Sequence, residues 1–585
     1  MIFPYPVRGE QQKLMDFVSS TVMEKPVCIN ATTGFGKTPC ILSALLPFRR
    51  RVIWAVRTGN ESDRPIEELR AIDERASRRF FGLSYRGKKD MCLLKEGMDY
   101  DSAAYFCKKK MGACRYHKNL SDFSFSPSGP LLYSELFRIS KKENICPYYF
   151  QRALLPYASV LGMSYNYVLS DAGYSLRSVF PFHESFLVVD EAHNLERVAL
   201  GLNSIKVTRR SVERATGEVE RIGDGECESV LKALLDIIDG LEGERRVDMN
   251  GLIEHLNARG MYEKFLSYGD RIRDEELEKG AEPRSSMYHA GQFFQALEEK
   301  SSEEGVVLIA EEGSESLELY DMRSRAFLSD VWDEFLGCVF CSGTLEPVEG
   351  FAETIGLKTH EGRSFYLPFR DENIKAYILK GISTEGEVLS GEMCARYVEQ
   401  ISDFLRLGRK SAVFCSSYRV MDSILDGGLC EVLNKNGTKF LVERQSMGGA
   451  DARGTLEVFR ALDKGCLIAS AQGRFAEGID LPHELDSIFI AGVPFERMDL
   501  KMRLYIDYCM QIYGSAAGRY YSYTVPAIRK AAQAMGRALR SEDDKALIVC
   551  GDERYARPDF FELLPHYFRA GARVITRLRD VESNL

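Results

Sequence analysis

Val27-Cys28-Ile29-Asn30-Ala31-Thr32-Thr33-Gly34-Phe35-Gly36-Lys37-Thr38 is an apolar run that ends in a short loop and a Gly-Lys-Thr triplet. Residues 27–29 predict a buried strand, and a helix is expected to begin near Lys37. Gly34 and Gly36 tolerate positive φ, so the loop can turn its backbone N–H groups toward an anion, and the helix adds its positive dipole end. The stretch therefore predicts a phosphate-binding loop in an α/β fold.

The chemistry of this loop assigns roles to its residues. Lys37 is expected to reach the β- and γ-phosphates of a nucleotide, and Thr38 is expected to bind Mg²⁺. The usual pattern G-x-x-x-x-G-K-[ST] has one departure here, because Ala31 occupies the position of the first Gly. Alanine is the least costly replacement, and the strand–loop–helix context favours a nucleotide site over a chance glycine-rich turn. The residues expected around the phosphates are Thr33, Gly34, Phe35, Gly36, Lys37 and Thr38.

Length and composition indicate a globular protein of several domains. The 585 residues are too many for one core and suggest three or four domains. No run of eighteen apolar residues occurs, and residues 1–6 are unlike a signal peptide. We therefore expect a cytoplasmic protein, associated with the nucleoid in a prokaryote, with no membrane partner. The fifteen cysteines are scattered, which in a reducing compartment favours metal ligands and buried thiols over disulfides.

Charge is distributed unevenly along the chain. The net charge is −9, but residues 81–150 carry 12 Lys+Arg against 7 Asp+Glu, a local +5. Residues 201–325 carry 17 against 28, a local −11. This contrast is typical of a molecule that confines a polyanion to one track and repels it elsewhere. The alternative from charge alone is a solvated surface with no partner.

Polar residues near the phosphate loop are candidates for ligand contacts. Gln11 lies ahead of the loop and can bind an adenine edge, with Arg8 to orient it; plain surface residues are the alternative. Residues 51–56 predict a second parallel strand, and Arg57 and Thr58 follow it directly. Ligands bind at the carboxyl ends of strands in open α/β sheets. Arg57 and Thr58 are thus candidates for contacts with a nucleic-acid backbone.

Four cysteines lie in the basic segment 81–150, separated by 14, 6 and 31 residues. Four thiolates can close a tetrahedral zinc site or hold a cubane iron–sulfur cluster. Zinc sites usually contain two short C-x₂₋₄-C pairs, and this set has none, so the spacing favours the cluster. Zinc and four unrelated core thiols are the alternatives. The four candidates are Cys92, Cys107, Cys114 and Cys146; Lys108, Lys109 and Lys110 lie beside aromatic residues, as on a surface that binds single strands.

The second strong motif is Phe186-Leu187-Val188-Val189-Asp190-Glu191-Ala192-His193. The apolar residues predict a central strand, with two carboxylates at its end. Asp190 can hold Mg²⁺ through water, while Glu191 orients and deprotonates the attacking water in phosphoryl transfer. His193 is expected to couple this site to the neighbouring domain. The alternative, a helix cap, is disfavoured because the chain also contains the phosphate loop.

Between and beyond these motifs, the chain alternates helical and sheet patterns. Residues 201–325 show mainly helical periodicity and abundant Glu, which predicts an inserted helical domain. The sheet pattern resumes at 338–345, where Ser342 and Thr344 lie at a strand end; Cys338 and Cys341 are interpreted as buried thiols. From about residue 370 a second α/β series begins without a Gly-Lys-Thr triplet.

The second α/β series contains a basic helical face. Gln533, Arg537 and Arg540 fall at i, i+4 and i+7, on one face of a helix. Two arginines there can approach a γ-phosphate and neutralise transition-state charge, an effect on the order of 10³ or more in rate. An exposed basic helix is the alternative. The preceding block Glu477-Gly478-Ile479-Asp480 adds Gly478 and Asp480 as candidates for the nucleotide site.

Together these blocks resemble the motif series of superfamily 2 helicases, and the four-cysteine segment narrows the resemblance to the XPD (Rad3-like) iron–sulfur DNA helicases. Length and domain order are similar to those of an archaeal member. The resemblance implies ATP-driven 5′-to-3′ translocation on single-stranded DNA, duplex unwinding, a [4Fe-4S] cluster near the point of strand separation, and a role in nucleotide excision repair. It also implies a monomer with single-stranded and forked DNA as partners, and repair proteins as further partners.

The resemblance also divides the chain into domains. Two RecA-like parallel-sheet motor domains are expected, the first from residues 1–80, 151–200 and 326–369 and the second from residues 370–585. The first is interrupted by an iron–sulfur domain at 81–150 and by a helical arch domain at 201–325 that closes a hole over the DNA strand. The residues expected on the DNA path are Arg57, Thr58, Lys108, Lys109, Lys110, Tyr165, Ser342 and Thr344.

Three other functions are compatible with parts of this motif series. A DNA-stimulated ATPase could translocate without separating strands, and a DinG-like helicase would share the same motifs. A non-enzymatic redox sensor could bind DNA through its cluster. An intact Glu191, together with Gln533, Arg537 and Arg540, disfavours the sensor, because a non-catalytic scaffold needs neither a water-activating carboxylate nor arginine fingers.

Overall fold

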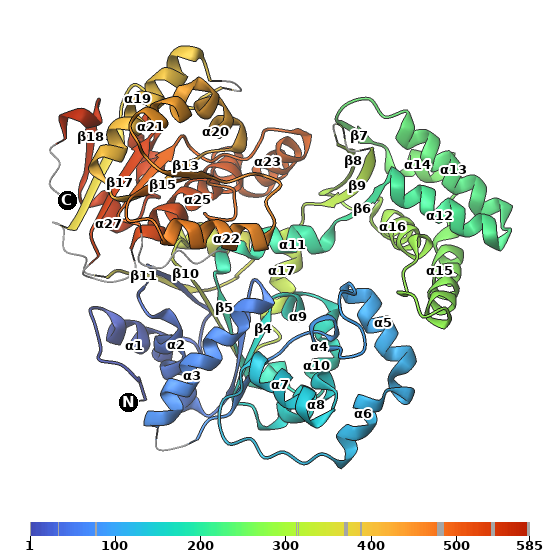
Figure 1. Ribbon diagram of the computed structural model, residues 1–585. Helices are drawn as coiled ribbons and strands as arrows, with labels where there is room; N and C mark the ends of the chain where they lie inside the picture. The colour runs from blue at the N-terminus through green and yellow to red at the C-terminus, as the bar shows by residue number, and fades with distance from the viewer. Residues whose placement is uncertain are drawn as a thin grey trace.

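The chain forms two parallel α/β sheets, one above the other in Figure 1. The structure is a computed structural model and describes residues 2–32, 34–76, 79–311, 313, 315–367, 373–386, 389–476, 485–539 and 544–581. Each sheet has seven strands, and every pairing within them is parallel. This confirms the predicted fold class.

The first sheet has the order β11-β1-β10-β5-β2-β4-β3. Its central strands are continuous apolar runs because helices cover both faces. β1 pairs with β10, and β10 with β5, so that Asn30 lies beside Ser342 and Cys341 beside Asp190. The two sequence motifs therefore end at the same edge of the sheet. The strands are β1 (Val27–Ala31), β2 (Arg51–Val56), β3 (Gly82–Ser84), β4 (Val160–Ser164), β5 (Ser185–Asp190), β10 (Gly337–Ser342) and β11 (Glu361–Phe365).

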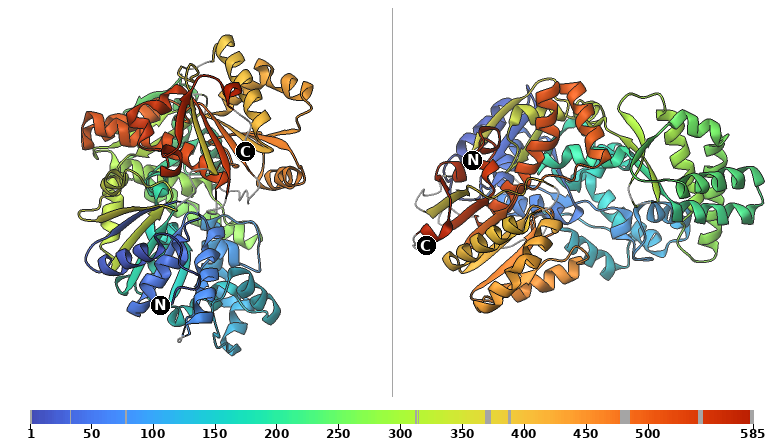
Figure 2. Two further views of the ribbon diagram at one scale, coloured as in Figure 1. Left: turned by 90° about the vertical axis from the view of Figure 1, so that its left-hand side faces the viewer. Right: turned by 90° about the horizontal axis from the view of Figure 1, so that it is seen from above.

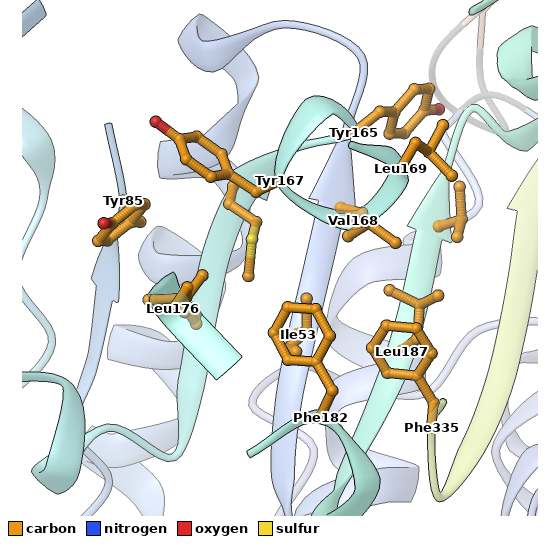
Figure 3. Packing of buried hydrophobic residues seen from close by; sticks show 14 of the residues in the cluster. Ile53, Tyr85, Tyr165, Tyr167, Val168, Leu169, Leu176, Phe182, Leu187 and Phe335 are labelled. Carbon is orange, nitrogen blue, oxygen red and sulfur yellow. The ribbon is translucent and has the colours of Figure 1, made fainter. Parts of the chain in front are cut away.

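Two hydrophobic clusters fill the faces of this sheet. One includes residues from α1 (Gln11–Thr21), α2 (Lys37–Leu45) and α3 (Arg64–Arg75). The other includes Ile53 and Leu187 from the sheet with Phe182 and Phe335, whose rings stack at 5.1 Å (Figure 3). The helices on that side are α8 (Pro147–Leu154), α9 (Asn166–Leu169), α10 (Tyr174–Arg177), α11 (Leu195–Asn203), α17 (Ser324–Trp332) and α18 (Val348–Thr354).

The second sheet has the order β14-β15-β13-β16-β17-β12-β18. Its strands are β12 (Ile374–Leu379), β13 (Lys410–Cys415), β14 (Phe440–Val442), β15 (Gly465–Ser470), β16 (Ser487–Ala491), β17 (Ala546–Gly551) and β18 (Ala572–Ile575). Its helices include α19 (Gly391–Leu407), α20 (Tyr418–Ile424), α21 (Cys430–Lys435), α22 (Gly449–Arg460), α23 (Leu500–Tyr513), α24 (Ser515–Arg519), α25 (Val525–Met535), α26 (Pro558–Phe561) and α27 (His566–Arg569). α25 extends toward the first sheet and carries Gln533, but it ends at Met535, so Arg537 lies in the following 3₁₀ turn Gly536–Ala538 and not on the predicted helical face.

The cysteine segment 81–150 interrupts the first sheet. Its first residues form β3, which pairs with β4, so the inserted part begins after Ser84. Short helices follow, because the segment offers few long apolar repeats: α4 (Lys88–Met91), α5 (Tyr100–Lys110), α6 (Arg115–Asn119), α7 (Tyr133–Glu143) and α8.

The arch domain, residues 201–325, is not wholly helical as predicted. Its helices are α12 (Arg209–Ile222), α13 (Gly225–Asp239), α14 (Met249–His255), α15 (Met261–Glu278) and α16 (Ser286–Lys300). They pack against an antiparallel sheet of order β6-β9-β8-β7. The strands are β6 (Ile205–Thr208), β7 (Arg245–Val247), β8 (Val306–Ala310) and β9 (Ser316–Asp321). The run 306–310 is a strand buried on both faces, because the helices of the arch domain cover one face and α23 covers the other.

The arch domain contacts two separate parts of the molecule. Its sheet packs on α23 of the second domain, with Lys501 Nζ 2.5 Å from Glu318 Oε1. At its other end α15 lies across from α5 of the cysteine segment (Figures 1 and 2). There the buried guanidinium of Arg273 lies over the ring of Tyr105, 3.9 Å from its centroid, and bonds Asp101 at 2.8 Å. These two contacts close a ring of protein through both domains.

No helix among the described residues is both long and apolar enough to cross a membrane.

Candidate functional site

The phosphate loop has the backbone that the sequence predicts. Gly34 and Gly36 have φ of 79° and 81°, in the left-handed region that glycine adopts without strain. α2 begins at Lys37, and the Lys37 Nζ donates to the carbonyl of Ala31 at 3.1 Å. The lysine therefore lies across the loop, where a phosphate can replace the carbonyl as its partner. Thr38 is buried at the first turn of α2, and Thr33 lies outside the described residues.

Gln11 braces the phosphate loop from behind. Its side chain is buried, its Nε2 donates to the carbonyl of Phe35 at 2.7 Å, and its Oε1 accepts from the backbone N–H of Arg8 at 2.8 Å. A Cβ on Gly36 would lie 3.0 Å from the same Nε2. Gln11 therefore fixes the loop to the segment at Arg8. Contacts of Gln11 and Arg8 with an adenine remain predictions.

Asp190 and Glu191 lie at the end of β5, opposite the phosphate loop. Burial raises the pKa of Asp190 to about 6, and the negative charge of Glu191 adds to the rise. Removal from water raises the pKa of Glu191, but the net shift is downward, chiefly because of the charge of Lys37, with a further contribution from the hydrogen bond of Ser342. Glu191 therefore stays ionised at neutral pH, as a general base requires. Its backbone is left-handed, with φ of 48°, which turns the side chain out of the strand direction.

Tyr165 does not lie on a DNA path as predicted. Tyr165 is 1% exposed and packs with the hydrophobic cluster of the first sheet (Figure 3). Its hydroxyl donates to the backbone carbonyls of Asp190 and Glu191. The tyrosine follows β4 at the edge of the sheet, where an aromatic ring fits between the sheet and α9. Its role is therefore to support the backbone of the acidic pair.

A chain of hydrogen bonds joins the acidic pair to the second domain. Gln533 Nε2 on α25 lies 2.6 Å from His193 Nε2, and His193 Nδ1 lies 2.7 Å from Ser342 Oγ. Ser342 Oγ donates to Glu191 Oε2 at 3.1 Å. With the Gln533 amide donating, His193 carries its proton on Nδ1. Ser342 was predicted to contact DNA, but it is buried and belongs to this network instead.

Removal of Gln533 is expected to weaken the coupling between the two domains. We expect Gln533→Ala to lower the DNA-stimulated rate of ATP hydrolysis about 10- to 100-fold, because His193 loses the contact that fixes its tautomer. The measurement is steady-state ATP hydrolysis with and without single-stranded DNA. Gln511→Ala, an exposed glutamine on α23 of the same domain, is the matched control. A DNA-stimulated rate for Gln533→Ala equal to that of Gln511→Ala would contradict the role of this contact.

Arg537 lies one turn beyond Gln533. Its Nε and Nη2 donate to the carbonyl of Ala476 at 2.9 and 2.7 Å, and its charge helps to lower the pKa of Glu191. The structure therefore brings Arg537 to the carboxylate that activates water. The other candidates from this domain, Gly478, Asp480 and Arg540, lie outside the described residues.

Asn30 is a site residue that the sequence analysis missed. Its Oδ1 accepts from the backbone N–H of Leu345 at 3.0 Å, and its Nδ2 lies 3.4 Å from Ser364 Oγ. It thus ties the strand before the phosphate loop to the loop after Ser342. The signal in the sequence was a buried amide inside an otherwise apolar strand, which must find partners across the sheet.

The four predicted cysteines converge from separate parts of the basic segment. Cys92, Cys107, Cys114 and Cys146 line one cavity, and its other walls include the apolar Leu93, Phe106, Met111 and Pro147. Burial raises the pKa of Cys107, and raises that of Cys146 to about 11. Tyr149 Oη lies 4.0 Å from Cys107 Sγ. Among the described residues, no group of three or more His, Cys, Asp and Glu side chains is arranged to hold a single metal ion.

The remaining predicted DNA contacts occupy different environments. Arg57 and Thr58 are exposed at the carboxyl end of β2. Lys108 is exposed on α5, and Lys110 borders the cysteine cavity. Lys109 pairs instead with Asp274 of the arch domain at 2.7 Å. Thr344 Oγ1 is buried and has no hydrogen-bond partner among the described residues, and its backbone N–H donates to Ser342 Oγ at 3.1 Å.

Comparisons with known proteins agree with this geometry. A DEAD_2 family model matches residues 54–212, and a Helicase C-terminal domain model matches residues 401–571. Together they span more than half of the chain and include both acidic residues, Gln533 and Arg537. The chain belongs to the XPD/Rad3-like helicase family.

Relatives in this family match over nearly the whole chain. The Saccharomyces cerevisiae general transcription and DNA repair factor IIH helicase subunit XPD/RAD3 is 23% identical, covering 100% of this chain and 90% of the relative. The Sulfolobus acidocaldarius ATP-dependent DNA helicase XPD is 24% identical, covering 94% and 96%. The solved structure titled XPD_Helicase has a TM-score of 0.72 at 21% identity, covering 98% of this chain and all of that one. The likeness shows that the XPD/Rad3 fold extends through both inserted segments.

Proposed function

We propose that this XPD/Rad3-like chain is an ATP-dependent DNA helicase that translocates 5′ to 3′ on single-stranded DNA and unwinds duplex, with a role in nucleotide excision repair. The observation that carries the proposal is the hydrogen-bonded path from Gln533 through His193 and Ser342 to Glu191. It joins the water-activating carboxylate to a helix of the other domain. Movement between the domains can therefore be linked to hydrolysis, which is what a translocating motor requires.

The residues of the cleft divide the work of phosphoryl transfer. Lys37 binds the phosphates together with the backbone N–H groups of the loop. Thr38 and Asp190 would hold Mg²⁺, which supplies charge neutralisation between the β- and γ-phosphates when bound. Ionisation of Asp190 is favoured by that cation, against the effect of burial. Glu191 accepts the proton of water, and Arg537 offsets the negative charge of the transition state.

The cysteine cavity fits a [4Fe-4S] cluster better than a zinc ion. A zinc–sulfur bond of about 2.3 Å would place four sulfurs roughly 3.8 Å apart. No such close group occurs among the described residues, although the four thiols do border one cavity. A cubane holds its ligands farther apart and is stable in apolar surroundings. Cys92, Cys107, Cys114 and Cys146 would hold it through their thiolates, although burial raises the pKa of Cys107 and Cys146.

Metal analysis of the anaerobically purified protein tests the cluster. We expect about four irons and four sulfides per chain and a broad absorption band, as four cysteine thiolates around a cubane predict. One zinc with no sulfide would contradict the cluster and leave the ATPase proposal intact.

Unwinding of a forked duplex with a 5′ single-stranded tail tests the helicase proposal itself. ATP hydrolysis without strand separation would favour a translocase instead.

The proposed partners follow from the same residues. Single-stranded and forked DNA would contact Arg57, Thr58, Lys108 and Lys110, which are exposed or border the cysteine cavity. Repair proteins are proposed partners because relatives are subunits of a transcription and DNA repair factor. We propose a monomer, since both motor domains that form the ATP cleft belong to the same chain. The proposed location is the cytoplasm or the nucleoid.

A further inference from the structure

Glu443 is a buried carboxylate that the mechanism above does not use. It follows β14 in the second domain, and its side chain is 1% exposed. Burying a carboxylate without partners costs folding free energy. The groups that bond Glu443 therefore indicate its role. Burial raises the pKa of Glu443.

The partners of Glu443 are backbone N–H groups of a single loop. Its Oε2 accepts from the N–H of Ser470 at 3.0 Å, and its Oε1 accepts from the N–H of Arg474 at 2.7 Å. The Tyr418 hydroxyl and the backbone of Phe475 also bond the carboxylate. A Cβ on Gly473 would lie 2.0 Å from Oε2, so glycine is the residue that lets the loop approach so closely. Glu443 thus holds residues 470–475 in one conformation.

The described part of this loop extends to Ala476, the residue to which Arg537 is hydrogen-bonded. Ala476 follows Phe475, and its carbonyl accepts both the Nε and the Nη2 of Arg537 at 2.9 and 2.7 Å. Ala476 is buried, so its carbonyl moves only if the loop moves. The position of the guanidinium across the cleft from Glu191 therefore depends on the loop that Glu443 organises.

We propose that Glu443 is a positioning residue for Arg537: it fixes the loop from Ser470 to Ala476 so that the guanidinium is held where phosphoryl transfer needs it. This inference rests on the proposed ATPase function. Several N–H groups converge on one carboxylate, and charge-assisted bonds of this kind are short and strong. A neutral amide at the same place would turn an NH₂ group toward a backbone N–H and displace the loop.

The expected effect of Glu443→Gln is on turnover. A displacement of about 1 Å in a catalytic group can cost 10²-fold in rate, so we expect kcat for ATP hydrolysis to fall about 10- to 100-fold. KM for ATP should change by less than about threefold, because an interaction made in the transition state affects kcat. Glu457→Gln, an exposed glutamate on α22 of the same domain, is the matched control and should behave as wild type.

Two further variants separate positioning from a general loss of stability. If Glu443 acts through Arg537, the double variant Glu443→Gln/Arg537→Ala hydrolyses ATP at the rate of Arg537→Ala alone. Tyr418→Phe removes one partner of Glu443 and keeps the ring, so it tests the same loop if Glu443→Gln does not fold; we expect a smaller fall in kcat with KM unchanged.

The experiment is steady-state ATP hydrolysis on single-stranded DNA, with thermal unfolding of each variant. A fall in kcat that the Arg537→Ala background abolishes supports the positioning role. A wild-type kcat in Glu443→Gln or, where that variant does not fold, in Tyr418→Phe would overturn it. The positioning role would also be overturned if the fold-decreases in kcat of Glu443→Gln and Arg537→Ala multiplied in the double variant. Absence of hydrolysis by the wild-type protein would instead contradict the proposed function, so the two failures are distinguishable.

Discussion

Glu191→Gln is expected to reduce DNA-stimulated ATP hydrolysis by about 10³-fold, within the range for loss of a general base. An amide cannot accept the proton of the attacking water, whereas the neighbouring groups are retained. Ser342 can still donate to the amide oxygen as it does to Glu191 Oε2, so the network to His193 and Gln533 is preserved. Binding of ATP and of single-stranded DNA is therefore expected to stay close to wild type.

The measurement combines steady-state ATP hydrolysis with fluorescence anisotropy of a labelled single strand. Glu184→Gln is the matched control, because this glutamate is 56% exposed and precedes the same strand, β5.

Lys37→Ala should also abolish hydrolysis while leaving DNA binding largely intact, since the ammonium group of Lys37 is expected to contact the phosphates of ATP and not the DNA. Hydrolysis at the wild-type rate in Glu191→Gln or in Lys37→Ala would contradict the assignment of the ATP site.

The sequence was sufficient to predict those parts of the site that phosphate chemistry constrains. The loop before Lys37 must combine glycines, a lysine and a hydroxyl at fixed spacing, and the acidic pair must follow a buried strand. The parallel order of the first sheet then brings both to one edge, because Asn30, Ser342 and Asp190 belong to neighbouring strands. The fold class followed from the same alternation of apolar strands and helices.

Side-chain direction was harder to predict than position. Ser342 lies at a strand end, as expected, and Tyr165 directly follows β4, but a strand end does not say whether a side chain faces DNA or the acidic pair. Both face inward and bond the acidic residues. Whether such a side chain meets the acidic pair depends on which strands lie beside its own strand. The order of strands in the sheet is set by contacts between residues far apart in the sequence.

The helices of the arch domain agree with the prediction, but its four strands were missed for a related reason. Strands of three to six residues, such as β7 at Arg245–Val247, carry too little periodicity to stand out beside long helices. The hydrogen bonds of Glu443 with Ser470 and Arg474 were also missed, because they join residues about thirty positions apart through backbone N–H groups that any sequence offers.

Replacement of Cys107 is expected to abolish unwinding before it affects hydrolysis. Cys107 lies on α5, and the same helix carries Tyr105 and Lys109, which contact Arg273 and Asp274 of the arch domain. Loss of one thiolate should release the proposed cluster and loosen α5 at both contacts, because metal binding and local folding are linked. The ATP cleft lies on the first sheet and shares none of these contacts. We therefore expect unwinding by Cys107→Ser to fall about 100-fold, with hydrolysis on single-stranded DNA within about threefold of wild type.

A forked-duplex unwinding assay, run beside ATP hydrolysis and the absorption spectrum of the same sample, measures this separation. Cys430→Ser is the matched control, because Cys430 is a partly exposed thiol at the start of α21 and lies far along the chain from the cavity. Normal unwinding by Cys107→Ser with the absorption band lost would show that α5 keeps its position without the cluster. Equal losses of unwinding and hydrolysis would place the cysteine cavity in direct support of the ATP cleft. Only the selective loss of unwinding agrees with the proposed role of the cluster. In that role the cluster orders α5, and α5 holds the arch domain through Tyr105 and Lys109.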